Sequence, residues 1–214
     1  NMTEMFLQMW EYTTKDRFLD RARYMPTVVR SGDGYVQPFY DSPLDDRNVG
    51  ETVFMHIINR AQRYVYITTP YLILDNEMIT ALTVAAQSGI DVRIITPGIP
   101  DKKLVYRVTR SYYQQLHRAG VKIYEYRPGF LHAKMIVSDD DVAVVGTMNM
   151  DFRSFFLHFE CGTVLYGGET ISEIRDDVLD TMGLSRQIDD EWFRSVPWLA
   201  SIAASILRLF APML

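Results

Sequence analysis

Two ionisable side chains, His132 and Lys134, stand in an otherwise apolar stretch of the sequence at residues 130–137. This stretch is expected to form a strand, in which successive side chains point to opposite faces. The imidazole and the ammonium group should therefore share one face. Two ionisable groups within such a strand cost free energy unless they serve a ligand or a reaction. The opposite, core-facing side is expected to carry Leu131, Ala133, Met135 and Val137.

A second set of polar groups follows in the Gly-Thr-Met-Asn segment at residues 146–149. A glycine followed by hydroxyl and amide side chains offers several neutral donors to one anion. Thr147 and Asn149 are two positions apart, so both are expected to point the same way. Together with His132 and Lys134 they are expected to surround a phosphate group. An imidazole that titrates near neutrality suits nucleophilic and acid–base chemistry at such a phosphodiester.

A carboxylate, Glu160, lies in the strand-like run at residues 159–166. A carboxylate beside a catalytic imidazole fixes its tautomer and stabilises its charged form, so Glu160 is a candidate partner of His132. His158 is close to Glu160 in sequence and is either a neighbour of the site or a structural residue. Tyr71 follows the end of a predicted strand, where sites often lie in open α/β sheets, or else it fills the core.

The spacing His132-x-Lys134-x4-Asp139, followed by Gly-Thr-x-Asn, closely resembles the signature of the phospholipase D superfamily. The apolar tail is similar to that of bacterial cardiolipin synthases. The resemblance covers nearly the whole chain and implies the C-terminal half of such a synthase. Three further segments resemble the corresponding parts of these synthases: residues 69–71, 119–126 and 147–154.

The chain departs from the family pattern in two ways. The family usually carries serine at the position of Thr147, and the hydroxyl group is kept here. Family members also use two such motifs, whereas this chain holds one. The resemblance therefore implies that a second motif comes from a missing N-terminal half or from a second copy of the chain.

The resemblance also implies a reaction. One histidine attacks phosphorus to form a phosphohistidine, while the histidine of the other motif moves protons on the leaving and incoming alcohols. Two phosphatidylglycerol molecules become cardiolipin and glycerol, and no metal or cofactor is required. The family assigns the second-motif histidine mainly to acid–base catalysis, which favours that role for His132 over the nucleophile. Lys134, Thr147 and Asn149 are implied to bind the phosphate.

Asp139 belongs to the motif, and the implied catalytic set is His132, Lys134, Asp139 and Glu160. The hairpin expected around residues 139–141 places Asp139 at a turn, which favours a structural role. The acidic run could also suggest a calcium site, but a solvated hairpin turn is the favoured interpretation because no further ligand spacing is present.

The elements that must position these groups alternate regularly between residues 51 and 126. Strict alternation of strands and helices implies crossover connections and a sheet covered on both sides. After Pro128 the alternation of strands and helices ends, and two strands joined as a hairpin are expected. The predicted fold class is α/β, a mixed, largely parallel β-sheet with helices on both faces. Strands are expected at 35–40, 64–69, 91–95, 121–126, 130–137, 142–146 and 159–166, and helices at 51–62, 75–89, 102–119 and 169–182.

Three regions are expected along the chain. Residues 1–30 are interpreted as a helical connector from a missing upstream domain, and residues 31–188 as a phospholipase D-like domain with one motif. Residues 189–214 are expected to form a C-terminal amphipathic helix. This helix lies either on a membrane or partner, or on the domain itself.

Composition limits the function classes. The 214 residues are 48% hydrophobic and 23% charged, as in an ordinary folded protein. The net charge of −5 argues against a nucleic-acid partner. The single cysteine, Cys161, cannot form an internal disulfide. The resemblance to cardiolipin synthases, and not the composition, implies a phospholipid, phosphatidylglycerol, and a membrane surface as partners.

The resemblance implies a location at the bacterial cell membrane, as part of a longer membrane-anchored protein of which this part is peripheral or soluble. Two alternatives remain open at this point. One is a homodimeric phosphodiesterase or nuclease of the same superfamily, and the other is an inactive lipid-binding half.

Overall fold

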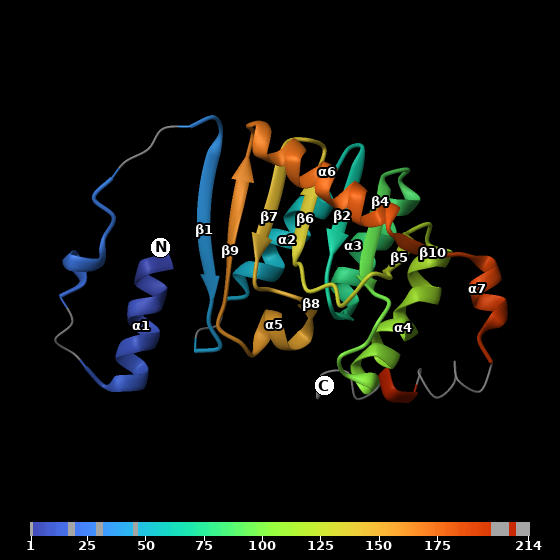
Figure 1. The fold of residues 1–214 in the computed structure, drawn as a ribbon, viewed down its shortest axis with the longest axis horizontal. Coiled ribbons are helices and arrows are strands. Elements are labelled where there is room, and N and C mark those ends of the chain that lie inside the picture. The colour runs from blue at the N-terminus through green and yellow to red at the C-terminus, as the bar shows by residue number, and fades with distance from the viewer. Residues whose placement is uncertain (1, 17–19, 29–31, 45–46, 198–205, 209–214) are drawn as a thin grey trace.

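The computed structural model describes residues 2–16, 20–28, 32–44, 47–197 and 206–208 (Figure 1). Its centre is an eight-stranded sheet with the strand order β1-β9-β7-β6-β2-β4-β5-β10. A second, two-stranded parallel sheet joins β3 (Leu72–Ile73) to β8 (Met150–Asp151). The strands of the large sheet, in its spatial order, are Tyr35–Asp41, Glu160–Tyr166, Val142–Gly146, Met135–Ser138, Tyr64–Thr68, Asp91–Pro97, Lys122–Tyr126 and Ser185–Ile188.

Helices cover both faces of the large sheet, as predicted (Figure 1). The larger core lies between the sheet and α2, α3 and α4, whereas α6 packs on the opposite face over a smaller core. Short helices, α5 and α7, lie near the ends of the strands. The described helices are α1 (Met2–Thr14), η1 (Arg21–Tyr24), α2 (Val49–Arg60), α3 (Asn76–Gln87), α4 (Lys103–Arg118), α5 (Phe152–Phe156), α6 (Glu169–Gly183) and α7 (Asp190–Ser195).

The mixed α/β fold confirms the predicted class, but the parallel part of the sheet is smaller than expected. Within the large sheet, β2 pairs in parallel with β4, and β4 with β5, while the other neighbours are antiparallel. Parallel neighbours of this sheet arise only in the β2-α3-β4-α4-β5 part of the chain, where each helix joins two adjacent strands. β6 and β7 form a hairpin, and the edge strands β1 and β10 pair antiparallel with β9 and β5, which do not precede or follow them directly in the chain.

Local signals at the helix ends match the predictions. Asp75 caps α3 by accepting a hydrogen bond from the Met78 N–H at 2.8 Å. Gly120 follows α4 with a φ of +102°, a conformation that L side chains rarely adopt. These stops explain why the predicted bounds of both helices lie within two residues of the observed ones.

The structure describes parts of both ends of the chain. α1 and η1 make the first thirty residues largely helical where they are described, and Arg21 joins them through Glu4 and Glu11 at 2.5 and 2.7 Å. At the other end, α7 stops at Ser195, two residues before Pro197, so no single helix starts at residue 189 and continues through the tail.

Most of the predicted amphipathic segment, 198–205 and 209–214, lies outside the described residues. Of the tail residues that are described, Leu207 packs against the larger core and Arg208 lies 4.0 Å over the Tyr112 ring. Among the described helices, none combines the length and the apolar character that crossing a membrane requires.

Candidate active site at one edge of the sheet

Antiparallel pairing brings four chain segments to the same edge of the large sheet. β2 ends where β6 begins, because Thr68 pairs with Met135. Met135 also pairs with Val145 near the end of β7, and Gly146 pairs with Gly162 near the start of β9. The residues at the end of β2, just before β6, just after β7 and at the start of β9 therefore meet, although these segments are separated in sequence.

The segment before β6 carries His132 and Lys134. The strand begins at Met135, later than predicted, and residues 131–134 approach it without strand pairing. The predicted alternation of faces is nevertheless observed. His132 is exposed and Lys134 is half-buried, while the four residues expected on the core side are buried or partly buried against the α6 face: Leu131, Ala133, Met135 and Val137.

The ammonium group of Lys134 is partly buried and feels the charge of two carboxylates. Its Nζ donates a hydrogen bond to the His132 carbonyl oxygen at 2.7 Å. Burial lowers the pKa of Lys134, while the negative charges of Glu160 and Asp151 act in the opposite direction. An ammonium group that has lost part of its water gains more from an anionic oxygen than an exposed one does. Lys134 is therefore suited to holding a phosphate oxygen.

Glu160, at the start of β9, is buried, with 8% of its surface exposed. The Thr147 hydroxyl donates a hydrogen bond to its carboxylate, and His158 Nδ1 lies 3.5 Å from its Oε1. Within the described ranges no hydrogen bond or ion pair joins Glu160 to His132. The carboxylate is thus at the predicted edge of the sheet, but its contacts are with Thr147 and His158.

Thr147 is held by β9. Its N–H donates to the Cys161 carbonyl at 2.9 Å, and its hydroxyl accepts from the Cys161 N–H at 3.0 Å. This hydroxyl also donates to Glu160, whereas the Asn149 amide donates to Ser154, so the two side chains predicted to point the same way have different partners. The geometry gives Thr147 a role in positioning Glu160, and phosphate binding by its side chain stays a prediction.

Asn149 lies in the loop that leads into β8 and α5. Its Nδ2 donates to the Ser154 hydroxyl at 3.0 Å, and its Oδ1 is buried without a hydrogen-bond partner among the described residues. Asp151 caps α5 by accepting from the Ser154 N–H at 2.7 Å. The loop is anchored to the rest of the fold where the Met150 N–H donates to Thr69 Oγ1 at 3.0 Å.

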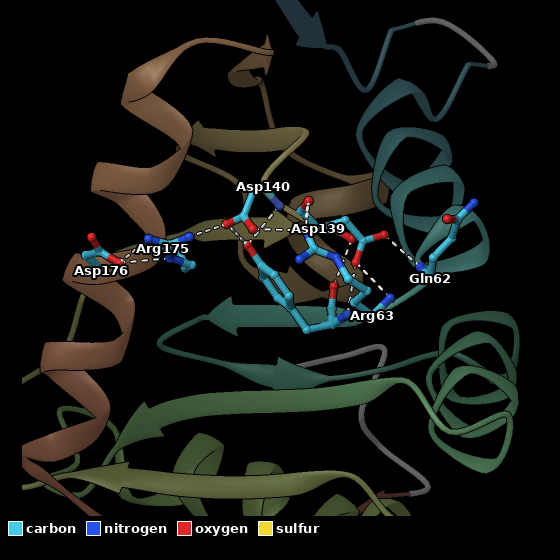
Figure 2. Close-up of polar contacts among 8 residues, drawn as sticks. Gln62, Arg63, Asp139, Asp140, Arg175 and Asp176 are labelled. Carbon is cyan, nitrogen blue, oxygen red and sulfur yellow. Dashed lines mark hydrogen bonds and ion pairs between the residues drawn. The ribbon is translucent and has the colours of Figure 1, made fainter.

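Asp139 lies at the opposite end of β6, in the turn that leads to β7 (Figure 2). Its carboxylate accepts hydrogen bonds from the backbone N–H groups of Gln62, Arg63 and Tyr64 at 2.7, 2.9 and 2.9 Å. The structure therefore does not bring Asp139 together with His132. This geometry supports the structural interpretation of Asp139, which ties the hairpin turn to the loop between α2 and β2.

The neighbouring carboxylate, Asp140, joins the same turn to α6 (Figure 2). It accepts from the Tyr64 hydroxyl at 2.9 Å and pairs with Arg63 at 2.9 Å and Arg175 at 2.5 Å. Burial acts to raise the pKa of Asp140, but these three donors lower it below its ordinary value. The oxygens of this acidic turn are thus used by protein donors, which supports a hairpin turn over a calcium site.

A cavity of about 250 Å³ opens beside Asn149. One wall is formed by the residues that come after β2 in the chain and by the start of α4. The other wall is formed by β8, α5 and the loop before β9. The sequence drew attention to Tyr71, Asn149 and His158, but not to the charged side chains of the cavity. The lining residues are Tyr71, Ile73, Lys102, Val105, Asn149, Asp151, Phe152, Arg153 and His158.

The chain is similar in sequence to a known family and to proteins of that family. The family described as "Cardiolipin synthase, PLD-like domain" matches residues 54–181. The chain is 42% identical over 212 residues to a cardiolipin synthase of Geobacillus kaustophilus and 38% identical over 211 residues to one of Alkalihalophilus pseudofirmus. Each match covers 98% of this chain and 42% of the relative. The chain thus spans less than half the length of these relatives.

Solved structures share the fold at low sequence identity. Nuc of Salmonella typhimurium, a phospholipase D family member, superposes with a TM-score of 0.62 at 15% identity, over 73% of this chain and 99% of Nuc. A phosphatidylserine synthase of Haemophilus influenzae gives 0.63 at 16% identity, over 84% of this chain and 47% of that chain. At these identities the likeness shows the fold alone.

Proposed function

This chain belongs to the cardiolipin synthase family of phospholipase D-like domains, and from that membership we propose that its site transfers a phosphatidyl group between two alcohols. The substrate is phosphatidylglycerol, and the products are cardiolipin and glycerol. The observation that carries the proposal is the placing of His132 and Lys134 at the sheet edge that also holds Asn149 and the buried Glu160.

The reaction proceeds in two displacements at phosphorus. A histidine nitrogen attacks the phosphodiester, the P–N bond forms, and the bond from phosphorus to the glycerol oxygen breaks. A second histidine gives its proton to the departing oxygen. The hydroxyl of another phosphatidylglycerol then attacks phosphorus, returns a proton to that second histidine and breaks the P–N bond. Atoms and protons balance, and the nucleophile is regenerated.

His132 acts as the general acid and base in this scheme. It is exposed at the rim of the site, with its ring 5.6 Å from that of Phe130, so it can reach a substrate that binds from outside. Lys134 and Asn149 bind the non-bridging phosphate oxygens, where negative charge must be stabilised through the transition state. Thr147 and His158 hold Glu160 at the back of the site.

The scheme needs two histidines, each from its own His-x-Lys motif. The described residues supply one such motif, the one with His132 and Lys134. We assign the second His-x-Lys motif to another part of the longer protein or to a second copy of this chain. The comparison supports this step, since the matched cardiolipin synthases are more than twice as long as the region they share with this chain. The site acts at a membrane surface, where its lipid substrate resides, and binding at that surface excludes water that would otherwise hydrolyse the intermediate to phosphatidic acid.

The test uses the longest natural protein that contains this chain. The purified protein is given labelled phosphatidylglycerol in vesicles, and cardiolipin, phosphatidic acid and glycerol are measured. His132→Ala should abolish detectable cardiolipin. Lys134→Met should reduce its rate on the order of 100-fold, the loss typical for one donor to a transition-state oxyanion. His56→Ala, on the exposed side of α2, is the matched control and should keep the wild-type rate.

Equal cardiolipin production by the wild type and His132→Ala would refute the proposal. Cleavage of a nucleic acid by the wild type, with no product from phosphatidylglycerol, would favour the nuclease alternative. Binding to phosphatidylglycerol vesicles with no turnover of the lipid would favour the inactive lipid-binding alternative.

A further inference from the structure

The cavity beside Asn149 is too small for a whole phospholipid and lies next to the phosphate-binding position. Its volume is about 250 Å³, below the range of about 300–1,000 Å³ typical of sites for drug-sized molecules. Asn149 connects it with the site, because this residue lines the cavity and is one of the two proposed ligands of the phosphate. A group bound in the cavity is therefore adjacent to a phosphate held by Lys134.

Hydrogen-bond acceptors occupy one side of the cavity. The Asp151 carboxylate is buried, with 6% of its surface exposed, and the Ser154 N–H uses its Oδ1, so its second oxygen is available to a hydroxyl donor. The His158 ring also lines the cavity, and its Nδ1 faces Glu160, which leaves Nε2 for a ligand. These groups need a ligand that donates hydrogen bonds, and a bare phosphate at neutral pH donates few.

Asn149 adds an amide whose buried Oδ1 lacks a hydrogen bond within the described part of the chain. Its Oδ1 has no partner among the described residues, whereas its Nδ2 is bonded to the Ser154 hydroxyl. The Ser154 hydroxyl can donate or accept, so turning the amide over would leave Nδ2 unpaired in place of Oδ1. A buried polar atom without a partner costs free energy, and a ligand hydroxyl satisfies it in either orientation because it both donates and accepts.

Cations occupy the other parts of the wall. Lys102 lines the cavity with its Nζ 5.6 Å from the centre of the Tyr71 ring, and Arg153 lines it from α5. Tyr71 is held in place by a hydrogen bond from its hydroxyl to Asp101 at 2.5 Å. The positive charges of Lys102 and Arg153 repel a positively charged head group such as ethanolamine or choline. They favour a head group that is itself neutral and is attached to a phosphate.

We infer that this cavity is the subsite for the glycerol head group of the phosphatidylglycerol that leaves or attacks at phosphorus. Asp151, His158 and Asn149 bond its hydroxyls, and Lys102 excludes amine head groups. The inference rests on the proposed function and deepens it, since it assigns the choice of alcohol to residues outside the His-x-Lys motif. Selectivity for a polyol over an amine then arises from the charge of the wall.

The experiment measures the choice of alcohol by the same full protein. Phosphatidylglycerol vesicles are mixed with equal concentrations of labelled glycerol and labelled ethanolamine, and transfer to each is counted. Lys102→Glu places a carboxylate on the wall, and the ratio of ethanolamine to glycerol transfer should rise on the order of 10-fold. Lys102→Met should give a smaller rise. Lys103→Glu, an exposed neighbour that does not line the cavity, makes the same charge change and should leave the ratio at the wild-type value.

A binding measurement separates failure of the subsite from failure of the function. Calorimetry compares glycerol 1-phosphate with phosphoethanolamine for the wild type and for Lys102→Glu. The wild type should prefer glycerol 1-phosphate, and the variant should lose that preference. An unchanged transfer ratio and an unchanged binding preference in Lys102→Glu would overturn the subsite. Absent transfer to any alcohol, with the binding preference intact, would overturn the proposed function and leave the subsite standing.

Discussion

The hydroxyl of Thr147 donates its hydrogen bond to the carboxylate of Glu160. A residue of the predicted phosphate-binding loop is thereby committed to the buried carboxylate at the back of the site. The Thr147 N–H donates to the Cys161 carbonyl and the Cys161 N–H donates to the Thr147 hydroxyl, so the pairing of the loop with β9 directs this hydroxyl at Glu160. A residue that acts through another in this way is a positioning residue.

Replacing the Thr147 hydroxyl should therefore lower the rate without removing it. Thr147→Val leaves Glu160 without its donor, and the rate of cardiolipin formation should fall on the order of 10-fold, since a hydrogen bond to a charged group contributes about 1.5–3 kcal/mol. Thr147→Ser keeps the hydroxyl and should restore the rate. The pH profile of kcat is the discriminating measurement, because Thr147→Val should move it while a merely structural defect would not. An unshifted profile at a reduced rate would refute the positioning role.

Asp139 should contribute to stability rather than to the chemical step. Asp139→Ala leaves three backbone N–H groups without their acceptor, at Gln62, Arg63 and Tyr64. The free energy of unfolding should fall by about 2–4 kcal/mol, as measured by urea denaturation. The neighbouring exposed residue supplies the matched control, since Asp141→Ala should change stability by less than about 0.5 kcal/mol. Unchanged stability together with lost activity of the folded variant would place Asp139 in the catalytic set after all.

The region of strict alternation was predictable from the sequence because each of its elements carries its own signals. Asp75 begins one helix and Gly120 ends another, and the bounds follow from these local groups. The alternation of faces around His132 was predictable for the same reason, since it needs only the period of an extended chain. Local pattern therefore gave the residues of the motif and the side of the chain they occupy.

The partners of those residues were not predictable, because they depend on pairing between distant segments. β3 and β8 are two residues each and become strands only by pairing with one another across the site. β10 forms because Ser185–Ile188 adds to the edge of β5. The contact of Glu160 with Thr147 follows from the register of β7 against β9, which no local pattern specifies. Asp151 joined the candidate site only once β8 had placed it.

Glu51 should make stability depend on pH. Burial raises the pKa of Glu51 to about 8, with Asp75 and Glu77 acting in the same direction and Asn48 in the opposite one. Between its ordinary pKa of 4.5 and about 8 the folded protein holds a proton that the unfolded chain releases. The contribution of Glu51 to the free energy of unfolding is thus fully present below pH 4.5 and is lost as the pH rises through about 8.

Glu51→Gln removes this titration and keeps a side chain of the same size. The stability curve of the variant should be flatter between pH 5 and 9, and near pH 9 the variant should be more stable than the wild type. The difference there should be on the order of 1 kcal/mol, because solvent screens this partly exposed carboxyl. Denaturation by urea at a series of pH values measures it. Parallel curves for the two proteins across this range would refute the assignment.

Glu125 on β5 and Arg110 on α4 form an ion pair, and breaking this pair should lower the free energy of unfolding. Glu125 is buried, with 1% of its surface exposed, and Arg110 Nε and Nη2 donate to its two oxygens at 2.7 and 2.8 Å. Arg110→Met leaves a buried carboxylate whose remaining hydrogen-bond donors, among the residues that the structure describes, are the hydroxyls of Tyr106 and Tyr113 at 3.4 Å. Because Arg110 itself is partly exposed, the loss of unfolding free energy should lie at about 2–3 kcal/mol, at or below the lower end of the range for buried pairs.

A double variant tests whether the lost unfolding free energy comes from the Glu125 carboxylate that has lost its ion-pair partner. Arg110→Met combined with Glu125→Gln removes both charges, so most of the stability lost in Arg110→Met should return if the unpaired carboxylate is the cause. Equal stabilities for the single and double variants at neutral pH would instead assign the loss to the packing of the Arg110 side chain, whose guanidinium lies 4.3 Å from the Tyr106 ring centre.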